Sequence, residues 1–230
     1  MKTNKEYLGI FFILTVIIIY LFYDFILGEI IFVSGDTLAP QAIKQAINNL
    51  KSDIGTFPNW FPYIYSGMPT VHSFLSVSDY YFPHKIMQIL ESYGLPWIWN
   101  FLFHYIFAGI GMFALLRFLK QPKLVSIFSS ILFSISPYMV VYLVHGHGSQ
   151  IMTASYIPWI ILFLFKIYDN MNILNFILLS LFVGLQLQRG HIQIAYYTWM
   201  MIGLFITVRT CLFFKNKKYD SKEFKIFCYK

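Results

Sequence analysis

Residues 96–119 read PWIWNFLFHYIFAGIGMFALLRFL, and this stretch decides the fold class. Its one formal charge is Arg117, close to the end. An apolar run of about 18 residues or more is long enough to cross a lipid bilayer as a helix. We therefore predict an all-α integral membrane protein with about six transmembrane helices, at residues 7–27, 96–119, 124–144, 152–167, 171–187 and 194–214.

The composition of the whole chain agrees with this class. Hydrophobic residues make up 58% of the 230 residues, charged residues 12%, and the mean hydropathy is +0.62. A soluble domain of this size could not bury so much apolar surface. The net charge of +7 does not indicate nucleic acid, because the lysines and arginines cluster at the ends of apolar runs. The predicted partner is membrane lipid.

The positions of the positive charges predict the topology. Lys2 and Lys5, the group from Arg117 to Lys123, Lys166, and the residues from Arg209 to Lys218 should share one side. The positive-inside rule makes that side the cytoplasm, so residues 1–6 and 215–230 are both cytoplasmic. The basic tail is expected to be an inside loop that precedes another helix, or a simple cytoplasmic tail. The outer face receives residues 28–95, 145–151 and 188–193.

The long first outer loop, residues 28–95, contains an amphipathic pattern. In SGDTLAPQAIKQAINNLK, residues 34–51, apolar side chains recur at helical spacing and polar ones occupy the other face. We predict a helix over about 38–51 that lies in the membrane interface. The loop continues with WFPYIYSGMP and DYYFP, whose aromatic rings suit the membrane boundary or the apolar face of a sugar.

Two carboxylates in this loop are candidate site residues. Asp36 is the predicted catalytic residue, either as a general base or as a carboxylate that orients an acceptor or a metal. The alternative is that Asp36 or Thr37 is a helix N-cap. Asp79 is a substrate-binding candidate, and it too has an N-cap as its alternative.

The two short outer loops resemble each other. HGHGSQ (145–150) and RGHIQ (189–193) both contain Gly-His and end in Gln, and an isoleucine follows in each case. Helix N-termini favour anions, and Arg189 adds a cation; its alternative role is an anchor to lipid phosphates. A divalent metal, such as zinc on three histidines and a carboxylate, remains open, although no cofactor or metal ligand is assigned. The substrate-binding candidates in these loops are His145, His147, Gln150, Arg189, His191 and Gln193.

In their order along the chain, these motifs over residues 30–200 resemble the N-terminal part of bacterial YfhO-type membrane proteins, which are C-type glycosyltransferase-like. The resemblance implies transfer of a sugar from a polyprenyl-phosphate donor at the outer face of the bacterial cytoplasmic membrane. It also implies a central acidic residue in the first outer loop, the position of Asp36. Family members have more spans, so the chain is expected to be an N-terminal portion.

Two other function classes stay open. A lipid or solute transporter, or flippase, would show broken helices or paired charges deep within the spans. A non-catalytic membrane assembly protein would be insensitive to a change at Asp36. Motifs for nucleotide hydrolysis or for dinucleotide binding are absent from the sequence.

Overall fold

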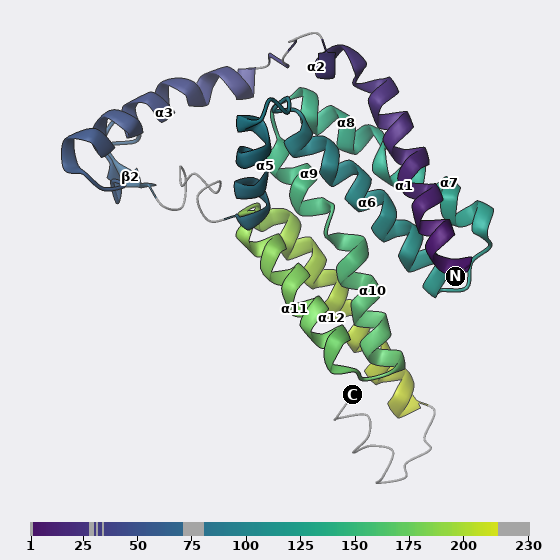
Figure 1. The fold of residues 1–230 in the computed structure, drawn as a ribbon. Coiled ribbons are helices and arrows are strands. Elements are labelled where there is room, and N and C mark those ends of the chain that lie inside the picture. Colours follow the sequence, from purple (N-terminus) through teal and green to yellow (C-terminus); the bar gives the residue numbers. More distant parts are fainter. Residues whose placement is uncertain (1, 28–29, 31, 34, 71–80, 216–230) are drawn as a thin grey trace.

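The computed structural model describes residues 2–27, 30, 32–33, 35–70 and 81–215. Only the backbone is described at residues 2–4, 35–37, 39–40, 213 and 215. This part of the chain is mostly helical (Figure 1), with one pair of short antiparallel strands, β1 (Trp60–Phe61) and β2 (Met68–Pro69). The helices are α1 (Lys2–Leu21), α2 (Tyr23–Leu27), α3 (Gly35–Ile54), α5 (Phe82–Ser92), α6 (Trp99–Phe118), α7 (Lys123–Ser134), α8 (Pro137–Val144), α9 (Gly148–Ala154), α10 (Ile157–Asp169), α11 (Ile173–Gln188) and α12 (Ile192–Lys215).

Four helical segments within the described residues are long and apolar enough to cross a membrane. A shorter apolar helix, α11, lies between the last two of them. Length and apolar composition together indicate a membrane protein. The number of six spans stays a prediction. The four segments are Trp99–Phe118, Lys123–Val144, Gly148–Asp169 and Ile192–Leu212.

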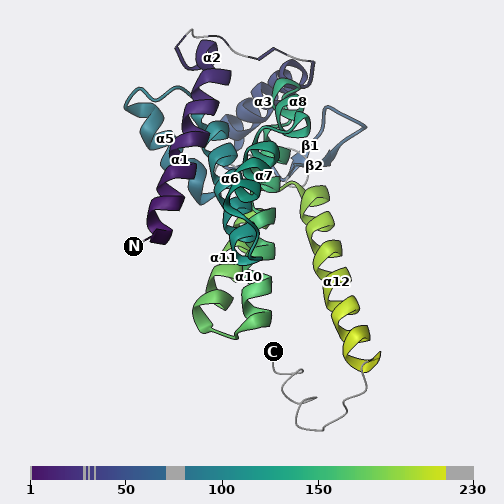
Figure 2. The ribbon, with the colours of Figure 1, turned by 90° about the vertical axis from the view of Figure 1, so that its right-hand side faces the viewer.

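Helix α6 forms the centre of the bundle. It packs against α1, α7 and α10, and successive long helices alternate in direction (Figures 1 and 2). Leu102, Tyr105, Ala108 and Phe113 on α6 are fully buried. The apolar residues of α6 face other helices on almost every side, so its position is fixed by packing rather than by one apolar stripe.

Small polar residues allow α6 and α7 to approach closely. The Ser130 hydroxyl donates to the backbone oxygen of Gly109 over 2.6 Å, and the Ser134 hydroxyl donates to that of Tyr105 over 2.6 Å. Both serines are fully buried. Interhelical contacts through small residues and hydroxyls are typical of helix association in membranes, where the hydrophobic effect does not drive helices together.

Replacing Gly109 by leucine is expected to destabilise the bundle. A Cβ at this position would lie 2.6 Å from Leu14 Cδ1 on α1 and 3.3 Å from Ser130 Oγ on α7. Overpacking of this kind costs about 1–3 kcal/mol. The control is Gly203→Leu, on the exposed side of α12 with open space around it. Thermal unfolding in detergent should separate the two variants, and equal melting temperatures would contradict the packing argument.

Two of the apolar segments are interrupted. Between α7 and α8 the chain turns at Pro137, which has no N–H to donate, and the Ser136 hydroxyl accepts from the N–H of Met139 over 3.5 Å. Between α9 and α10 the break falls at Ser155 and Tyr156, just before the proline of α10. The second break places Tyr156 inside the bundle, 3% exposed.

Positive residues from distant parts of the chain gather at one end of the bundle. The Arg117 guanidinium lies 3.4 Å from the carboxylate of Glu6 on α1. The Arg209 guanidinium lies 4.1 Å from the ring centroid of Tyr168, and with Lys120 it lines a hollow of about 360 Å³. The structure therefore brings Arg117, Lys120 and Arg209 to one end of the bundle, while the membrane topology stays a prediction.

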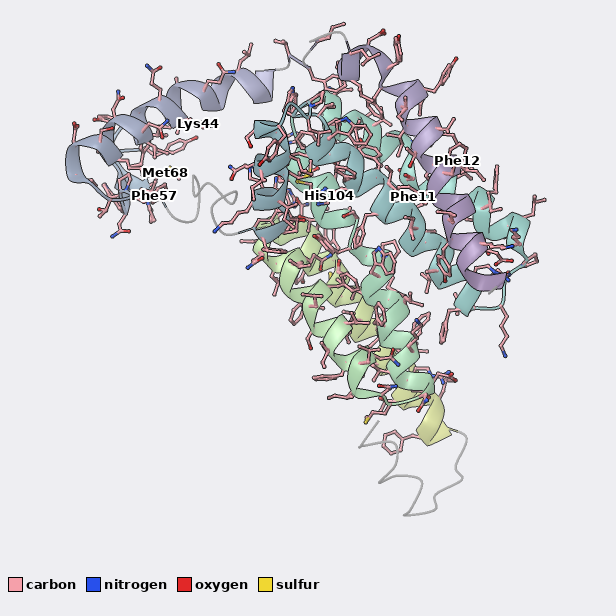
Figure 3. All side chains as sticks on the ribbon, in the orientation of Figure 1. Phe11, Phe12, Lys44, Phe57, Met68 and His104 are labelled. Atoms are coloured by element: carbon pink, nitrogen blue, oxygen red, sulfur yellow. The ribbon has the colours of Figure 1, made fainter. Side chains whose placement is uncertain are left out.

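Helix α3 and the two strands, which belong to the first loop, extend away from the bundle (Figure 1). Along α3, Ile47 is buried while Lys44 and Asn48 are exposed. The amphipathic character of the helix stays a prediction. Figure 3 shows Met68 and Phe57 beneath α3, on the side of the returning chain. Contact of α3 with a membrane interface stays a prediction.

Candidate functional site

A pocket of about 140 Å³ opens at the end of the bundle opposite the basic cluster, where α6 and α9 begin and α11 ends (Figure 1). Binding sites for whole small molecules usually measure about 300–1,000 Å³, so this one suits a single head group. Its wall combines a cation, an imidazole and aromatic rings from four parts of the chain. The lining residues are Tyr81, His84, Trp97, Asn100, Phe101, Met152 and Arg189.

Behind this pocket, three buried side chains form a hydrogen-bonded chain. His104 Nδ1 lies 2.7 Å from the backbone oxygen of Asn100, which can only accept, so Nδ1 carries the proton. His104 Nε2 then accepts from the Tyr81 hydroxyl over 2.7 Å, and Tyr81 in turn accepts from the Tyr156 hydroxyl. His104 lies inside the bundle where α5, α6 and α9 meet (Figure 3). The chain fixes the position of the Tyr81 ring at the pocket wall.

The Arg189 side chain packs across that ring. Its guanidinium carbon lies 5.7 Å from the Tyr81 centroid, and its Nε donates to the sulfur of Met152 over 2.8 Å. Among the described residues Arg189 pairs with no carboxylate. Burial lowers the pKa of the guanidinium, a sign that water solvates the cation poorly. An anion in the pocket would supply the missing counter-charge.

Asn100, on the first turn of α6, connects several parts of the site. Its side-chain Nδ2 donates to the Glu91 carboxylate and to the backbone oxygen of Trp97, the latter over 3.1 Å. Its Oδ1 lies 3.0 Å from Nδ1 of His84. Asn100 is only 5% exposed. One buried amide therefore holds α5, through His84 and Glu91, against the start of α6.

The two short loops that resemble each other in sequence also resemble each other in structure. Gly146 and Gly190 both adopt left-handed φ angles, +86° and +80°. Each glycine N–H donates to a carbonyl three residues earlier, which ends the preceding helix. The next residue, His147 or His191, precedes a new helix. A residue with a Cβ would be strained at either glycine.

Residue Gly148, in the same loop, has a different role. It is buried, and a Cβ there would overlap the ring of Phe101 at the pocket wall. The glycine therefore lets α9 approach α6 closely enough to shape the pocket. This accounts for the second glycine of HGHGSQ, whereas the first serves the left-handed turn.

The candidate carboxylates cannot be placed at this site. Asp36 lies in the first turn of α3, but its side chain is outside the described ones. Asp79 lies outside the described residues altogether. Their roles stay predictions.

The candidates of the short loops divide into two groups. Arg189 lines the pocket, and both it and His147 lie close enough to His191 to affect it electrostatically. His145 is exposed, with Nδ1 2.8 Å from a carbonyl of its own helix. Gln193 is also exposed and donates to the Tyr197 hydroxyl within α12.

Gln150 is half-buried, and its Oε1 has no hydrogen-bond partner among the described residues. An unpaired buried amide oxygen carries a desolvation cost that a donor on a ligand would remove. The candidate role of Gln150 in substrate binding stays a prediction.

Sequence reasoning named Tyr81 only as one of several aromatic residues in the first loop. It missed four further residues of this region: His84, Asn100, His104 and Tyr156. Two of them carried a usable signal. Asn100 and His104 are polar residues four apart in an otherwise apolar run, so they share one face of a helix at membrane depth. Tyr81 and Tyr156 could not be found in this way, because the sequence is rich in tyrosine and only packing selects these two.

His191 makes stability dependent on pH. Burial lowers its pKa, and His147 and Arg189 lower it further. Its Nδ1 accepts from the N–H of Ile194, which requires the neutral ring. The unfolded chain therefore binds the proton more readily, and stability should fall as the pH drops below about 6.5. Melting temperatures of His191→Asn, which keeps a capping oxygen, should fall less between pH 7 and 5 than those of the exposed control His145→Asn. Equal losses would contradict this role.

No group of three His, Cys, Asp or Glu side chains within the described part of the chain is arranged to hold a metal ion. The side chains of Asp36 and Asp79 lie outside that part. A divalent metal at this end of the bundle stays an open alternative.

Comparisons with known proteins found no matching family model, no similar curated protein and no similar solved structure.

Proposed function

We propose that this chain is a polytopic, glycosyltransferase-like membrane protein that uses a polyprenyl-phosphate-linked sugar at the outer face of the bacterial cytoplasmic membrane. In this proposal six helices span the membrane, both termini are cytoplasmic, and α3 lies in the outer interface. The motifs that resemble YfhO-type proteins suggest this function, and the geometry of the pocket supports it independently of them.

The observation that carries the proposal is the position of Arg189. A partly buried guanidinium without a carboxylate partner among the described residues lines a pocket large enough for a head group. Guanidinium groups bind phosphate oxygens with two parallel hydrogen bonds. Trp97, 42% exposed, forms another part of the wall and offers a flat apolar surface to a sugar ring.

A second cavity supports a lipid carrier. An apolar pocket of about 400 Å³ is bounded by α1, α6 and α11, with Phe11, Phe107 and Phe182 among its lining residues. It also reaches His104 and Tyr156, which belong to the hydrogen-bonded chain behind the polar pocket. A site with a cation on one side and an apolar groove on the other suits a phosphate attached to a long hydrocarbon.

The chemistry of the transfer follows from these groups. The oxygen of an acceptor hydroxyl forms a bond to the anomeric carbon while the bond from that carbon to the phosphate oxygen breaks. The electron pair leaves with the polyprenyl phosphate, whose added charge Arg189 would stabilise. Asp36 is the proposed catalytic carboxylate, which orients the acceptor. The proposed substrate-binding residues are Asp79, His145, His147, Gln150, Arg189, His191 and Gln193.

The test is transfer of label from polyprenyl-phosphate sugars in membranes that contain the protein. Asp36→Asn keeps the shape of the side chain and removes its charge, so transfer should fall to background. Asp53→Asn is the matched control, because Asp53 is exposed near the far end of the same helix. Equal activity in both variants would exclude Asp36 from the mechanism. Absence of transfer from every donor, with correctly inserted protein, would refute the glycosyltransferase proposal.

A transporter is the second candidate, and one observation favours it. Two apolar segments are interrupted, at Pro137 and near Tyr156, and transporters often bind their substrates at interrupted helices. Flux of labelled lipid phosphates or solutes into proteoliposomes, without chemical transfer, would support this function instead. A non-catalytic assembly protein would show neither activity.

A further inference from the structure

We infer that His84 is the proton acceptor of the pocket, and that Asn100 and Glu91 are positioning residues that fix its tautomer. The identity of the hydroxyl that loses its proton rests on the proposed function. The state of the imidazole does not, because it follows from hydrogen bonds within the protein.

The first step is the orientation of the Asn100 amide. Its Nδ2 donates in two directions, to the carboxylate of Glu91 and to the backbone oxygen of Trp97. Both of these partners are acceptors, so the nitrogen and oxygen of the amide cannot be exchanged without losing two hydrogen bonds. The oxygen Oδ1 must therefore face His84.

The second step is the tautomer of His84. Oδ1 of Asn100 accepts only, and it lies 3.0 Å from Nδ1 of His84. Nδ1 must carry a proton, which leaves the lone pair of the neutral ring on Nε2. Nε2 has no hydrogen-bond partner among the described residues. Glu91, Asn100 and His84 thus form a carboxylate–amide–imidazole relay whose outer end is a free base.

The third step is the surroundings of this base. His84 lines the same small pocket as Arg189, where the proposed phosphate binds. The ionisable groups around His84 are Arg189 and Tyr81 across the pocket, Glu91 beyond Asn100, and Lys85 next to it on α5. Arg189 and Lys85 are cations and Glu91 is an anion, so the charges near His84 have opposite signs.

The other titratable groups of the pocket are already engaged. Burial raises the pKa of the Tyr81 hydroxyl far above its usual range, so Tyr81 stays protonated and donates to His104. His104 uses both ring nitrogens, one toward Tyr81 and the other toward the Asn100 backbone. Arg189 has no lone pair to offer. His84 is therefore the base that the described part of the pocket provides.

The step that follows is balanced in atoms and charge. As the acceptor oxygen bonds to the anomeric carbon, its proton moves to Nε2 of His84. The bond between the anomeric carbon and the phosphate oxygen breaks, and its electron pair remains on the phosphate, opposite Arg189. The imidazolium formed is stabilised through Asn100 by the charge of Glu91, and it later returns the proton to water. Asp36 then orients the acceptor without taking the proton.

The first experiment does not depend on catalysis. Nitrogen NMR of the full chain, labelled with ¹⁵N-histidine and held in lipid nanodiscs, distinguishes the two neutral tautomers. The His84 signals are those missing from His84→Gln. We expect the tautomer with the proton on Nδ1 in the unchanged protein, and its loss in Asn100→Leu. The opposite tautomer in the unchanged protein would overturn the inference, whether or not Asn100→Leu folds.

The second experiment uses the transfer assay over a range of pH. His84→Gln should lower the rate by about 10²–10⁴-fold, the usual contribution of a general base, and remove the acidic limb of the pH profile. Lys123→Gln is the control, since Lys123 is exposed at the start of α7 and does not line the pocket. An acidic limb that persists in His84→Gln would overturn the inference. If no donor supports transfer at all, the proposed function fails and the tautomer measurement alone decides the role of His84.

Discussion

Replacing Arg189 by glutamine is expected to reduce sugar transfer by about 100- to 1,000-fold, the usual cost of removing a group that stabilises charge in a transition state. The guanidinium is held against Tyr81 and Met152, and it pairs with no carboxylate in the described residues. Glutamine keeps much of the length and the hydrogen-bonding ability but carries no charge. The initial rate of label transfer, at equal amounts of inserted protein, measures the effect.

One further variant separates charge from shape at this position. Arg189→Lys keeps the charge but loses the planar group that lies over Tyr81, so an intermediate rate is expected. Arg117→Gln is the matched control, because Arg117 pairs with Glu6 at the basic end of the bundle. A normal rate in Arg189→Gln would contradict phosphate binding in this pocket and would leave Arg189 with a structural role only.

Replacing Asn100 by leucine is expected to lower the free energy of unfolding by about 2–4 kcal/mol. The volume of the side chain is similar, but three groups lose their partner: the Glu91 carboxylate, Nδ1 of His84 and the backbone oxygen of Trp97. Leaving a buried polar group unpaired costs about 1–3 kcal/mol, and more when the group is charged. Denaturation with increasing SDS in mixed micelles measures the change.

The control for this variant is Asn49→Leu, at an exposed position on α3. Asn49→Leu should change the free energy of unfolding by no more than about 0.5 kcal/mol, as is usual for surface substitutions. The double variant Asn100→Leu, Glu91→Leu should recover part of the loss, because it removes the unpaired carboxylate. If Asn100→Leu alone is as stable as the unchanged chain, the amide does not hold α5 to α6.

The class of the fold could be predicted from the sequence because it depends on local properties. The run from residue 96 to 119 is apolar over most of its length, and this alone requires a lipid environment or a deep core. Arg189 could also be singled out, since one cation in a short polar loop between apolar segments is conspicuous. The ends of α6 and α12, which carry Arg117 and Arg209, meet at one end of the bundle because successive helices alternate in direction (Figure 1).

The centre of the site could not be predicted, because it depends on how α5 packs. His84 and Glu91 lie on a short helix in a long loop, and nothing in their spacing shows that Asn100 will hold both. Tyr156 enters the bundle only because the helix is broken before α10. Asn100 and His104 were visible as polar residues in an apolar span, but their partners come from segments far away in sequence.

The hydrogen-bonded chain through Tyr81, His104 and Tyr156 also constrains how the protein assembles. Tyr81 lies just before α5, whereas His104 and Tyr156 belong to apolar segments that are long enough to cross a membrane. Until Tyr81 docks, Nε2 of His104 lacks its partner at membrane depth, at a cost in free energy. The hydrogen-bonded chain is therefore complete only when Tyr81 has docked against the bundle. Through Tyr81, the start of α5 is a structural part of the bundle rather than an independent appendage.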